Sequence, residues 1–529
     1  MEFWRGSVFY EIYMKSFQDS NGDGLGDFKG LTSRLDYLVD LGVDGIWLTP
    51  FYPSPQVDNG YDVSDYCDIN PDYGNMDLYH SNLDLYHSNP DYGNMADFRE
   101  FMKAADARGI KVIIDLVLNH SSTEHAWFKE SRSSKTNPKR DYYIWREKPN
   151  NWESFFGGSA WELDKLTGEY YYHSFAKEQA DLNWANPAVR AEIEQVLAFW
   201  LNEGVAGFRL DVINNLTLVL EFPDNPVVDN EMEHVYDRNQ QGLEQALEQI
   251  AAFCRKEREV FLVGEISSDK LPEIAKYSSK TMLDVTFNFN FGSVELLDAQ
   301  SVFTTLNEME TALQEGQWPT LFFGSHDMSR FTTRLSNGNL SKTKLLAFLM
   351  LTAKGIPFIY YGEEVGMPDL TFSSVEEMRD IQGTAAYYQA LQAGSDEQSA
   401  LELAINKTRD KARGPMVFSD GKPFTTGQPW IKMASLNEEE VLSMWHFYQA
   451  LLAFRKGHDF KEKEYSSLTL DGETLSYQRG EFLFLLHFGE TEVTYPLQEK
   501  SELVFGEAVM LEAGVKMGAY AGIALRVED

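Results

Sequence analysis

Cysteine is scarce in this chain of 529 residues, which contains only Cys67 and Cys254. The two lie far apart and show no metal-ligand spacing, so neither a disulfide framework nor a thiolate metal site is expected. No stretch approaches the ~20 apolar residues of a membrane-spanning helix. The first residues also lack a basic segment followed by an apolar run. We therefore expect a cytoplasmic protein without a membrane partner.

Basic residues are also few, because 46 Lys and Arg stand against 82 Asp and Glu, for a formal net charge of −36. Such acidity opposes binding to nucleic acids and membrane surfaces, which are themselves polyanionic. The length exceeds the size at which a single hydrophobic core stops growing, so one large domain with one or two smaller ones is expected.

Short apolar runs alternate with helical patterns through most of the chain. Helical spacing occurs at 31–41, 96–108, 188–203, in a region ending near 256, and at 341–353. The strand-like runs cover residues 8–13, 42–50, 111–120, 207–212, 260–265, 282–289, 320–327 and 357–364. Eight strand–helix units predict a (β/α)₈ barrel, which is an α/β fold with its ligand site at the carboxyl ends of the strands.

Two segments do not fit this alternation. Residues 121–185 are too long for an ordinary loop after the third strand, so we predict an inserted small domain there. Alternating runs over 463–529 predict a C-terminal antiparallel β domain. The barrel would then consist of residues 1–120 and 186–462.

A local repeat lies before the second of these helical patterns. PDYGNM occurs at 71–76 and 90–95, and DLYHSN occurs at 77–82 and 84–89. One repeated block is too short for a solenoid and predicts a tandem duplication in a loop at the rim of the barrel. The alternative interpretation is that His80 and His87 in this block are metal ligands, but a solvated duplicate loop is favoured.

The stretch DSNGDGLGD, at 19–27, has the chemistry of a loop for a hard cation. Oxygen-bearing Asp19, Asn21, Asp23 and Asp27 recur along it, and the glycines between them permit a tight wrap. The twelfth position is Gly30 rather than Glu, so it is not an EF-hand. The alternative is a polar turn without a metal.

The stretch GFRLDVIN, at 207–214, places Arg209 and Asp211 on one face of a short strand. Alone, this spacing fits either a structural ion pair or a catalytic strand end. Glu265 and Asp327 end two further strands, and three carboxylates on one rim would repel one another. Glycoside hydrolysis uses such an arrangement, with one carboxylate as nucleophile and another as proton donor.

Specific motifs accompany these strand ends. They are the loop from Asp19, QVDNGYDVSDY (56–66), DLVLNH (115–120), GFRLDV, Glu265, His326-Asp327 and RDKARGPM (409–416). With them the chain resembles an α-glucosidase of glycoside hydrolase family 13, in the group of oligo-1,6-glucosidases, dextran glucosidases and trehalose-6-phosphate hydrolases. The resemblance covers nearly the whole chain.

The resemblance implies a role for each matching residue. Asp211 would be the nucleophile, Glu265 the general acid and then base, and Asp327 the stabiliser of the transition state. Asp62 and Arg413 would clamp the non-reducing glucose, with His120 and His326 donating to its hydroxyls. Further residues implied in the pocket are Tyr61, Phe156, Gln179 and Arg209, the last of which would hold Asp211 ionised. The implied structural Ca²⁺ (or Mg²⁺) ligands are Asp19, Asn21, Asp23, the backbone oxygen of Leu25, and Asp27.

Val212 follows the nucleophile directly, where the resemblance links Val to α-1,6 bonds and Thr or Ala to α-1,4 bonds. We therefore expect a retaining exo-acting α-glucosidase that acts on isomalto-oligosaccharides without an organic cofactor, as a monomer or weak oligomer. The alternatives are a trehalose-6-phosphate hydrolase, or an α-glucosidase of broader specificity that also cleaves α-1,4 bonds or sucrose. A more distant alternative is a non-catalytic relative that serves a transporter.

Overall fold

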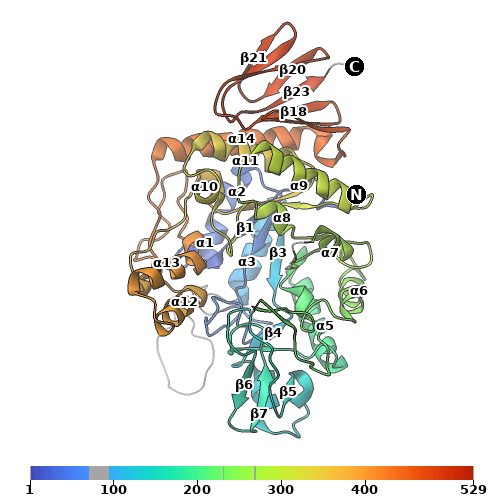
Figure 1. The fold of residues 1–529 in the computed structure, drawn as a ribbon, viewed down its shortest axis with the longest axis vertical. Coiled ribbons are helices and arrows are strands. Elements are labelled where there is room, and N and C mark those ends of the chain that lie inside the picture. Colours follow the sequence, from blue (N-terminus) through green and yellow to red (C-terminus); the bar gives the residue numbers. More distant parts are fainter. Residues whose placement is uncertain (1, 71–93, 230, 267, 269, 528–529) are drawn as a thin grey trace.

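The structure is a computed structural model that describes residues 2–70, 94–229, 231–266, 268 and 270–527. Eight parallel strands form the central sheet, in the order β13-β12-β9-β3-β2-β1-β15-β14. Figure 1 labels two of them, β1 and β3, near the middle of the molecule. The bounds of the eight strands are Phe9–Ile12 (β1), Gly45–Leu48 (β2), Lys111–Leu116 (β3), Gly207–Leu210 (β9), Phe261–Gly264 (β12), Val285–Thr286 (β13), Thr320–Leu321 (β14) and Ile356–Tyr360 (β15). Each coincides with one of the eight predicted strands, so the barrel prediction is confirmed.

The two end strands of this sheet, β13 and β14, are joined by a side chain. The hydroxyl of Thr320 donates to the carbonyl of Thr286 at 3.1 Å and accepts from the backbone N–H of Asn288 at 2.9 Å. A hydroxyl can both donate and accept, so Thr320 connects the two edges where the strands are only two residues long. The sheet is therefore a nearly closed barrel.

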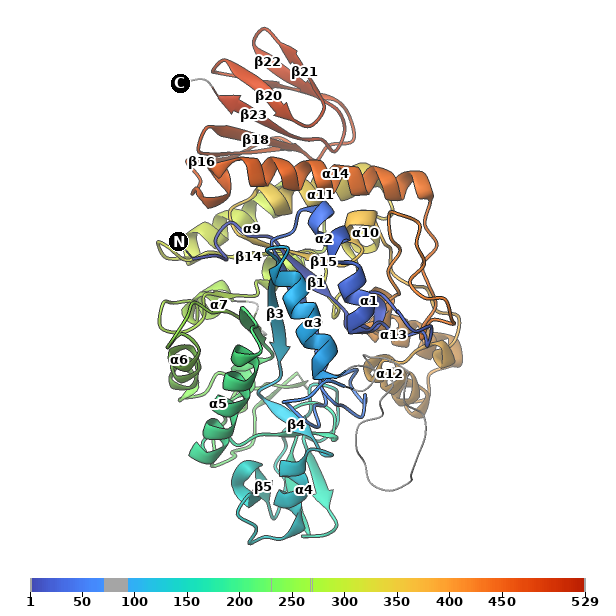
Figure 2. The ribbon, with the colours of Figure 1, turned by 180° about the vertical axis from the view of Figure 1, so that it is seen from behind.

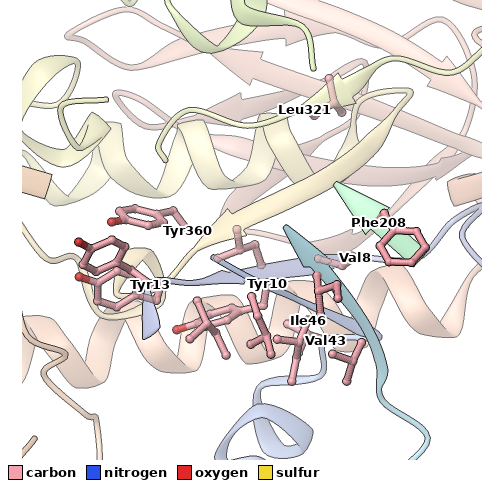
Figure 3. Close-up of a cluster of buried hydrophobic side chains, with 14 of the residues drawn as sticks. Val8, Tyr10, Tyr13, Val43, Ile46, Phe208, Leu321 and Tyr360 are labelled. Carbon is pink, nitrogen blue, oxygen red and sulfur yellow. The ribbon is translucent and has the colours of Figure 1, made fainter. Parts of the chain in front are cut away.

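Side chains alternate between the two faces of each strand, so the two faces of the sheet belong to two separate hydrophobic cores. Phe9, Trp47 and Phe358 belong to the cluster that fills the inside of the barrel. Tyr10 and Ile46, one residue away on the same strands, belong to the larger cluster between the sheet and its helices. Figure 3 shows Tyr10 and Ile46 on the side of the strands that faces a helix. Both faces of the sheet are buried, which explains why its strands are continuous apolar runs.

Helices cover the outside of the barrel. The predicted helix at 31–41 is wrong in one respect, because it begins earlier and breaks at Arg34, which has φ −106° and ψ 5°. Asp27 caps the first half, since its side chain accepts from the backbone N–H of Gly30 at 2.7 Å. The helices are Phe28–Ser33 (α1), Leu35–Leu41 (α2), Met95–Asp106 (α3), Pro187–Asn202 (α5), Leu243–Cys254 (α6), Leu271–Lys276 (α7), Phe289–Gly292 (α8), Ala299–Ala312 (α9), Phe331–Arg334 (α10) and Leu340–Thr352 (α11).

The strand predicted over 111–120 ends earlier than expected. β3 stops at Leu116, and His120–Ser122 form a separate strand, β4, that pairs antiparallel with Gln179–Asp181 (β8). His120 therefore belongs to the small sheet that joins the barrel to the inserted segment. The rest of that segment comprises Ala126–Ser133 (α4), Trp145–Arg146 (β5), Trp161–Asp164 (β6) and Glu169–Tyr172 (β7).

The chain leaves the barrel again after β15. Ile381–Gln392 (α12) and Glu397–Lys407 (α13) pack against each other, and Glu438–Gly457 (α14) then packs against α2 and α11 on the outside of the barrel. Figure 2 shows α14 between the barrel and a C-terminal domain made of strands. Those strands are Ser467–Asp471 (β16), Thr474–Arg479 (β17), Phe482–His487 (β18), Val493–Pro496 (β19), Ser501–Phe505 (β20), Ala508–Leu511 (β21), Gly514–Met517 (β22) and Gly522–Val527 (β23). They pair antiparallel, as predicted.

Short elements complete the described chain. They are the hairpin Val227–Val228 (β10) and Glu231–Met232 (β11), and the 3-10 helices Met14–Ser16 (η1), Arg140–Tyr142 (η3), Ile213–Asn215 (η4), Glu363–Val365 (η5), Val375–Glu377 (η6), Asp410–Ala412 (η7) and Asp459–Glu462 (η8). The repeated block, with His80 and His87, lies outside the described residues apart from Asn94 and Met95.

Candidate active site

Arg209 lies at the centre of the site and contacts three carboxylates. Its guanidinium donates to Asp115 of β3 at 2.8 Å, to Asp211 at 2.5 Å and to Glu265 at 2.5 Å. Arg209 and Asp211 share a strand face, as their spacing predicts. Glu265 follows β12, the neighbouring strand, so it emerges at the same rim. One cation therefore gathers carboxylates from three adjacent strands.

Burial sets the protonation of the two carboxylates predicted to react. It raises the pKa of Asp211 to about 6 and that of Glu265 to about 7, although Arg209 opposes both rises. The pKa of Glu265 is the higher of the two, so Glu265 holds a proton more readily than Asp211. The site thus pairs an ionised Asp211 with a protonated Glu265, which are the states of a nucleophile and a general acid.

Asp327, in the loop after β14, is surrounded by several cations, whereas Asp211 and Glu265 share one. Its side chain keeps 34% of its surface exposed and lies 3.1 Å from His326 and 2.9 Å from Arg413. Arg409 is a third cation, at 3.5 Å. Desolvation would raise the pKa of Asp327, but the three cations outweigh it and lower the pKa well below its usual range. Asp327 is therefore ionised and faces the open side of the site.

The backbone of Val212, which follows Asp211 and contacts Glu265, is strained. Its φ is 36° and its ψ is 45°, the left-handed region that β-branched residues rarely adopt. Such a conformation costs about 1–3 kcal/mol. It turns the backbone N–H of Val212 toward Glu265, to which it donates at 3.2 Å. Val212, directly after the predicted nucleophile, thus contacts the predicted acid, Glu265, through its backbone N–H.

Asp62 and Arg413, the predicted clamp on the glucose, have different partners in the structure, and Arg413 donates to Asp327 at 2.9 Å. Asp62 is fully buried, and its carboxylate accepts from the hydroxyl of Ser54 at 2.8 Å and from the backbone N–H groups of Val57 and Asp58 at 2.9 and 3.1 Å. The loop folds back on itself, so the carboxylate of Asp62 binds within its own turn, and its contact with glucose stays a prediction.

The structure pairs Asp58 with Arg409 instead. Arg409 donates to Asp58 at 2.5 Å and, on its other side, to Asp380 at 2.5 Å. The ring of Phe156, a predicted pocket residue, lies 5.6 Å from this guanidinium. Sequence reasoning missed Asp58, Arg409 and Asp380. The first two lie within the motifs QVDNGYDVSDY and RDKARGPM, which was the available signal.

Three more predicted pocket residues lie together. The amide of Gln179 approaches Asp58 at 3.2 Å and Nε2 of His120 at 3.1 Å, and that same nitrogen lies 3.2 Å from the carbonyl of Tyr61. Burial lowers the pKa of His120 to about 3, so its ring is neutral. The hydroxyl of Tyr61 donates to Asp115 at 2.9 Å, which connects this group to Arg209.

The inner side of the site is a narrow cavity with a mainly apolar wall. A cavity of about 10 Å³ borders Arg209, Glu265 and Asp327, and its remaining wall is largely aromatic, from Trp47, Phe287, Phe289, Phe322 and Phe358. This apolar wall explains the desolvation of Glu265. A larger cavity of about 370 Å³ lies between the inserted segment and α6 and borders none of these carboxylates.

The predicted metal loop is ordered by its own hydrogen bonds. Asp19 accepts from the backbone N–H groups of Asn21, Gly22 and Gly24 at 2.7–2.8 Å. Burial raises the pKa of Asp27, a cost that a bound cation would offset. Over the residues with described structure, no group of three or more His, Cys, Asp or Glu is placed to hold a metal ion. The oxygen donors fit a hard cation by their chemistry, and the Ca²⁺ or Mg²⁺ site stays a prediction.

The chain is similar to known proteins over most of its length. The family described as alpha amylase, catalytic domain, matches residues 11–83 and 79–463. An oligo-1,6-glucosidase of Parageobacillus thermoglucosidasius is 38% identical over 490 residues, which is 86% of this chain and 84% of that one. A trehalose-6-phosphate hydrolase of Escherichia coli is 38% identical over 483 residues, with the same coverage. The crystal structure of the Bacillus licheniformis trehalose-6-phosphate hydrolase superposes with a TM-score of 0.87 at 33% identity, over the whole of both chains.

The chain therefore belongs to the alpha amylase catalytic-domain family. Within that family it is a glycoside hydrolase of the α-glucosidase type, with a small carbohydrate as substrate. None of the helices in the described part of the chain is long and apolar enough to cross a membrane.

Proposed function

We propose that the protein is a retaining, exo-acting α-glucosidase that releases glucose from the non-reducing end of α-1,6-linked oligosaccharides. The observation that carries the proposal is the contact of Arg209 with both Asp211 and Glu265. Retaining enzymes keep their two carboxyl groups ~5–5.5 Å apart, whereas inverting enzymes leave room for a water between them. The guanidinium that contacts both carboxylates holds them close together, which supports the retaining spacing.

In the proposed mechanism, ionised Asp211 attacks the anomeric carbon while Glu265 gives its proton to the departing glycosidic oxygen. Glu265, now a carboxylate, then takes a proton from water, and that water releases glucose from Asp211. Asp327 is ionised and exposed, so it can accept from sugar hydroxyls and favour the positive charge that develops on the ring.

The exo-acting part of the proposal rests on Asp58 and Arg409. This ion pair is buried, with Asp58 4% and Arg409 9% exposed, and it borders Asp327. We expect the pair to close the pocket behind one glucose unit and to bind its hydroxyls. Mutants that lack it should lose affinity for the terminal glucose.

A neutral sugar fits the electrostatics better than a phosphorylated one. The cations that contact the carboxylate cluster are Arg209, His326, Arg409 and Arg413, and each already has carboxylate partners. A phosphate would need its own cation. Val212 and the similarity to an oligo-1,6-glucosidase support α-1,6 linkages. The similarity to a trehalose-6-phosphate hydrolase keeps that substrate as the second candidate.

The test is a product analysis on isomaltose, panose, maltose, sucrose and trehalose-6-phosphate. We expect glucose from isomaltose with the highest kcat/KM. Rapid proton NMR of the reaction should show α-glucose first, before mutarotation. Cleavage of maltose without cleavage of isomaltose would exclude the linkage, and β-glucose as the first product would exclude the retaining mechanism.

A further inference from the structure

Glu11, near the end of β1, is a buried carboxylate that none of the roles above uses. Glu11 and His326 are each 1% exposed. Oε1 of Glu11 accepts from the backbone N–H of His326 at 3.1 Å and lies 2.6 Å from the Nδ1 of its ring. With Glu11 as a carboxylate, which can only accept, Nδ1 carries the proton of this contact.

The other ring nitrogen also faces acceptors. Nε2 of His326 lies 3.1 Å from a carboxylate oxygen of Asp327 and 2.6 Å from the hydroxyl oxygen of Tyr61. Tyr61 gives its own proton to Asp115, which leaves its oxygen as an acceptor toward the ring. Nε2 therefore donates as well. A histidine that donates from both nitrogens is an imidazolium.

The charges around the ring favour this state. Burial would lower the pKa of His326, but Asp327 and Glu11 outweigh it and raise the pKa to about 9. Asp115 adds a third nearby carboxylate. Arg413 opposes the charge, since its Nε donates to the carbonyl of His326 at 2.8 Å. Tyr13 stacks on the ring at 6.4 Å and Trp47 meets it edge-on at 5.8 Å.

We propose that Glu11 is a positioning residue that keeps His326 doubly protonated, so that His326 presents a charged N–H to Asp327. Glu11 acts through His326 and does not touch the substrate. The catalytic consequence rests on the proposed function above, whereas the protonation state does not. The experiment therefore measures the two separately.

The first measurement is the titration of His326 by NMR in protein labelled with ¹⁵N-histidine. The His326 signals are assigned by their loss in His326→Gln. We expect both ring nitrogens to carry protons in the wild type at pH 7.5. Glu11→Gln keeps an acceptor oxygen but removes the charge, so the titration midpoint should fall by about one to three pH units.

The matched control is Glu364→Gln. Glu364 is another fully buried carboxylate, and it accepts from the hydroxyls of Tyr10 and Tyr37 at 2.7 and 2.8 Å. This variant should leave the His326 midpoint unchanged. A neutral His326 ring in the wild type at pH 7.5, or an equal midpoint in Glu11→Gln, would overturn the proposal. If Glu11→Gln does not fold, the wild-type spectrum alone decides.

The second measurement is kcat on isomaltose at pH 6 and pH 8. In Glu11→Gln, His326 remains protonated at the lower pH and loses its proton at the higher one. We therefore expect the loss of kcat to be about tenfold greater at pH 8 than at pH 6. An equal loss at both values would mark Glu11 as purely structural. If isomaltose is not cleaved at all, the proposed function fails while the NMR result still stands.

Discussion

The two sides of the rim use the same residue type in opposite ways. On one side a single cation, Arg209, serves three carboxylates, and burial raises the pKa of Asp211 to about 6 and of Glu265 to about 7. On the other side three cations surround Asp327, whose pKa falls well below its usual range. The ratio of cations to carboxylates therefore decides which group holds a proton and which stays charged.

The largest loss of activity is expected from Asp211→Ala, on the side of the rim where one cation serves three carboxylates. It removes the proposed nucleophile, so kcat should fall by about 10⁴-fold or more, as for other covalent catalysts. Hydrolysis of isomaltose is the measurement, and circular dichroism should show an unchanged fold. Added azide should restore turnover and give glucosyl azide of β configuration, since azide takes the place of the missing carboxylate. Wild-type activity in Asp211→Ala would exclude Asp211 as the nucleophile.

The cationic side is tested by Arg409→Met. The variant removes one cation from Asp327 and the partner of Asp58, so kcat/KM should fall by about 10²-fold or more. The matched control is Arg34→Met, because Arg34 is also buried and pairs with Asp420 at 2.9 Å far from the site. Arg34→Met should lower the melting temperature without a comparable loss of kcat/KM. Equal losses in both variants would contradict a binding role for Arg409.

The pH profile tests the carboxylate-rich side. Activity should be lost below about pH 6, as Asp211 takes up a proton, and above about pH 7, as Glu265 loses one. Asp327 should not titrate in this range, since its pKa is low. We expect a bell-shaped kcat/KM with its maximum between these values. Glu265→Gln should abolish the alkaline limb on an aryl glucoside whose leaving group needs no proton, and an unchanged limb would contradict the assignment.

The smallest expected effect is a change of linkage preference in Val212→Thr. The side chain changes little in volume, so discrimination should shift by about 1–2 kcal/mol, or roughly tenfold in the ratio of isomaltose to maltose kcat/KM. The backbone contact to Glu265 should persist, because Thr can adopt the same left-handed conformation at similar cost. A ratio equal to that of the wild type would show that Val212 does not set the linkage.

The sequence predicted the parts of the molecule that depend on local periodicity. The runs ending in Arg209-Asp211, Glu265 and Asp327 are apolar and bounded by polar breaks; the first two end directly after β9 and β12, whereas β14 stops at Leu321 and Asp327 lies in the loop that follows it. The helix over 31–41 was predicted as a single element because Leu31, Leu35 and Leu38 keep helical spacing on both sides of the break at Arg34. His120 was placed on β3 because its strand-like pattern runs on into β4.

The clamp could not be predicted in the same way. Asp58 and Asp62 lie four residues apart in one motif, and both are carboxylates next to the pocket. Which of them faces an arginine depends on how the loop folds back and on a partner 351 residues away. Loop closure over such a separation is decided by packing, and no periodicity in the sequence encodes it.

The sequence alone thus determined the barrel, its added segments, and the three carboxylates that follow its strands, because strand alternation and chain order are local properties. Only the tertiary structure decided the ion pairs and protonation states. Asp58 pairs with Arg409, Glu265 holds a proton more readily than Asp211, and His326 lies between Glu11 and Asp327. These depend on distance and burial, and the groups involved come from separate strands and loops.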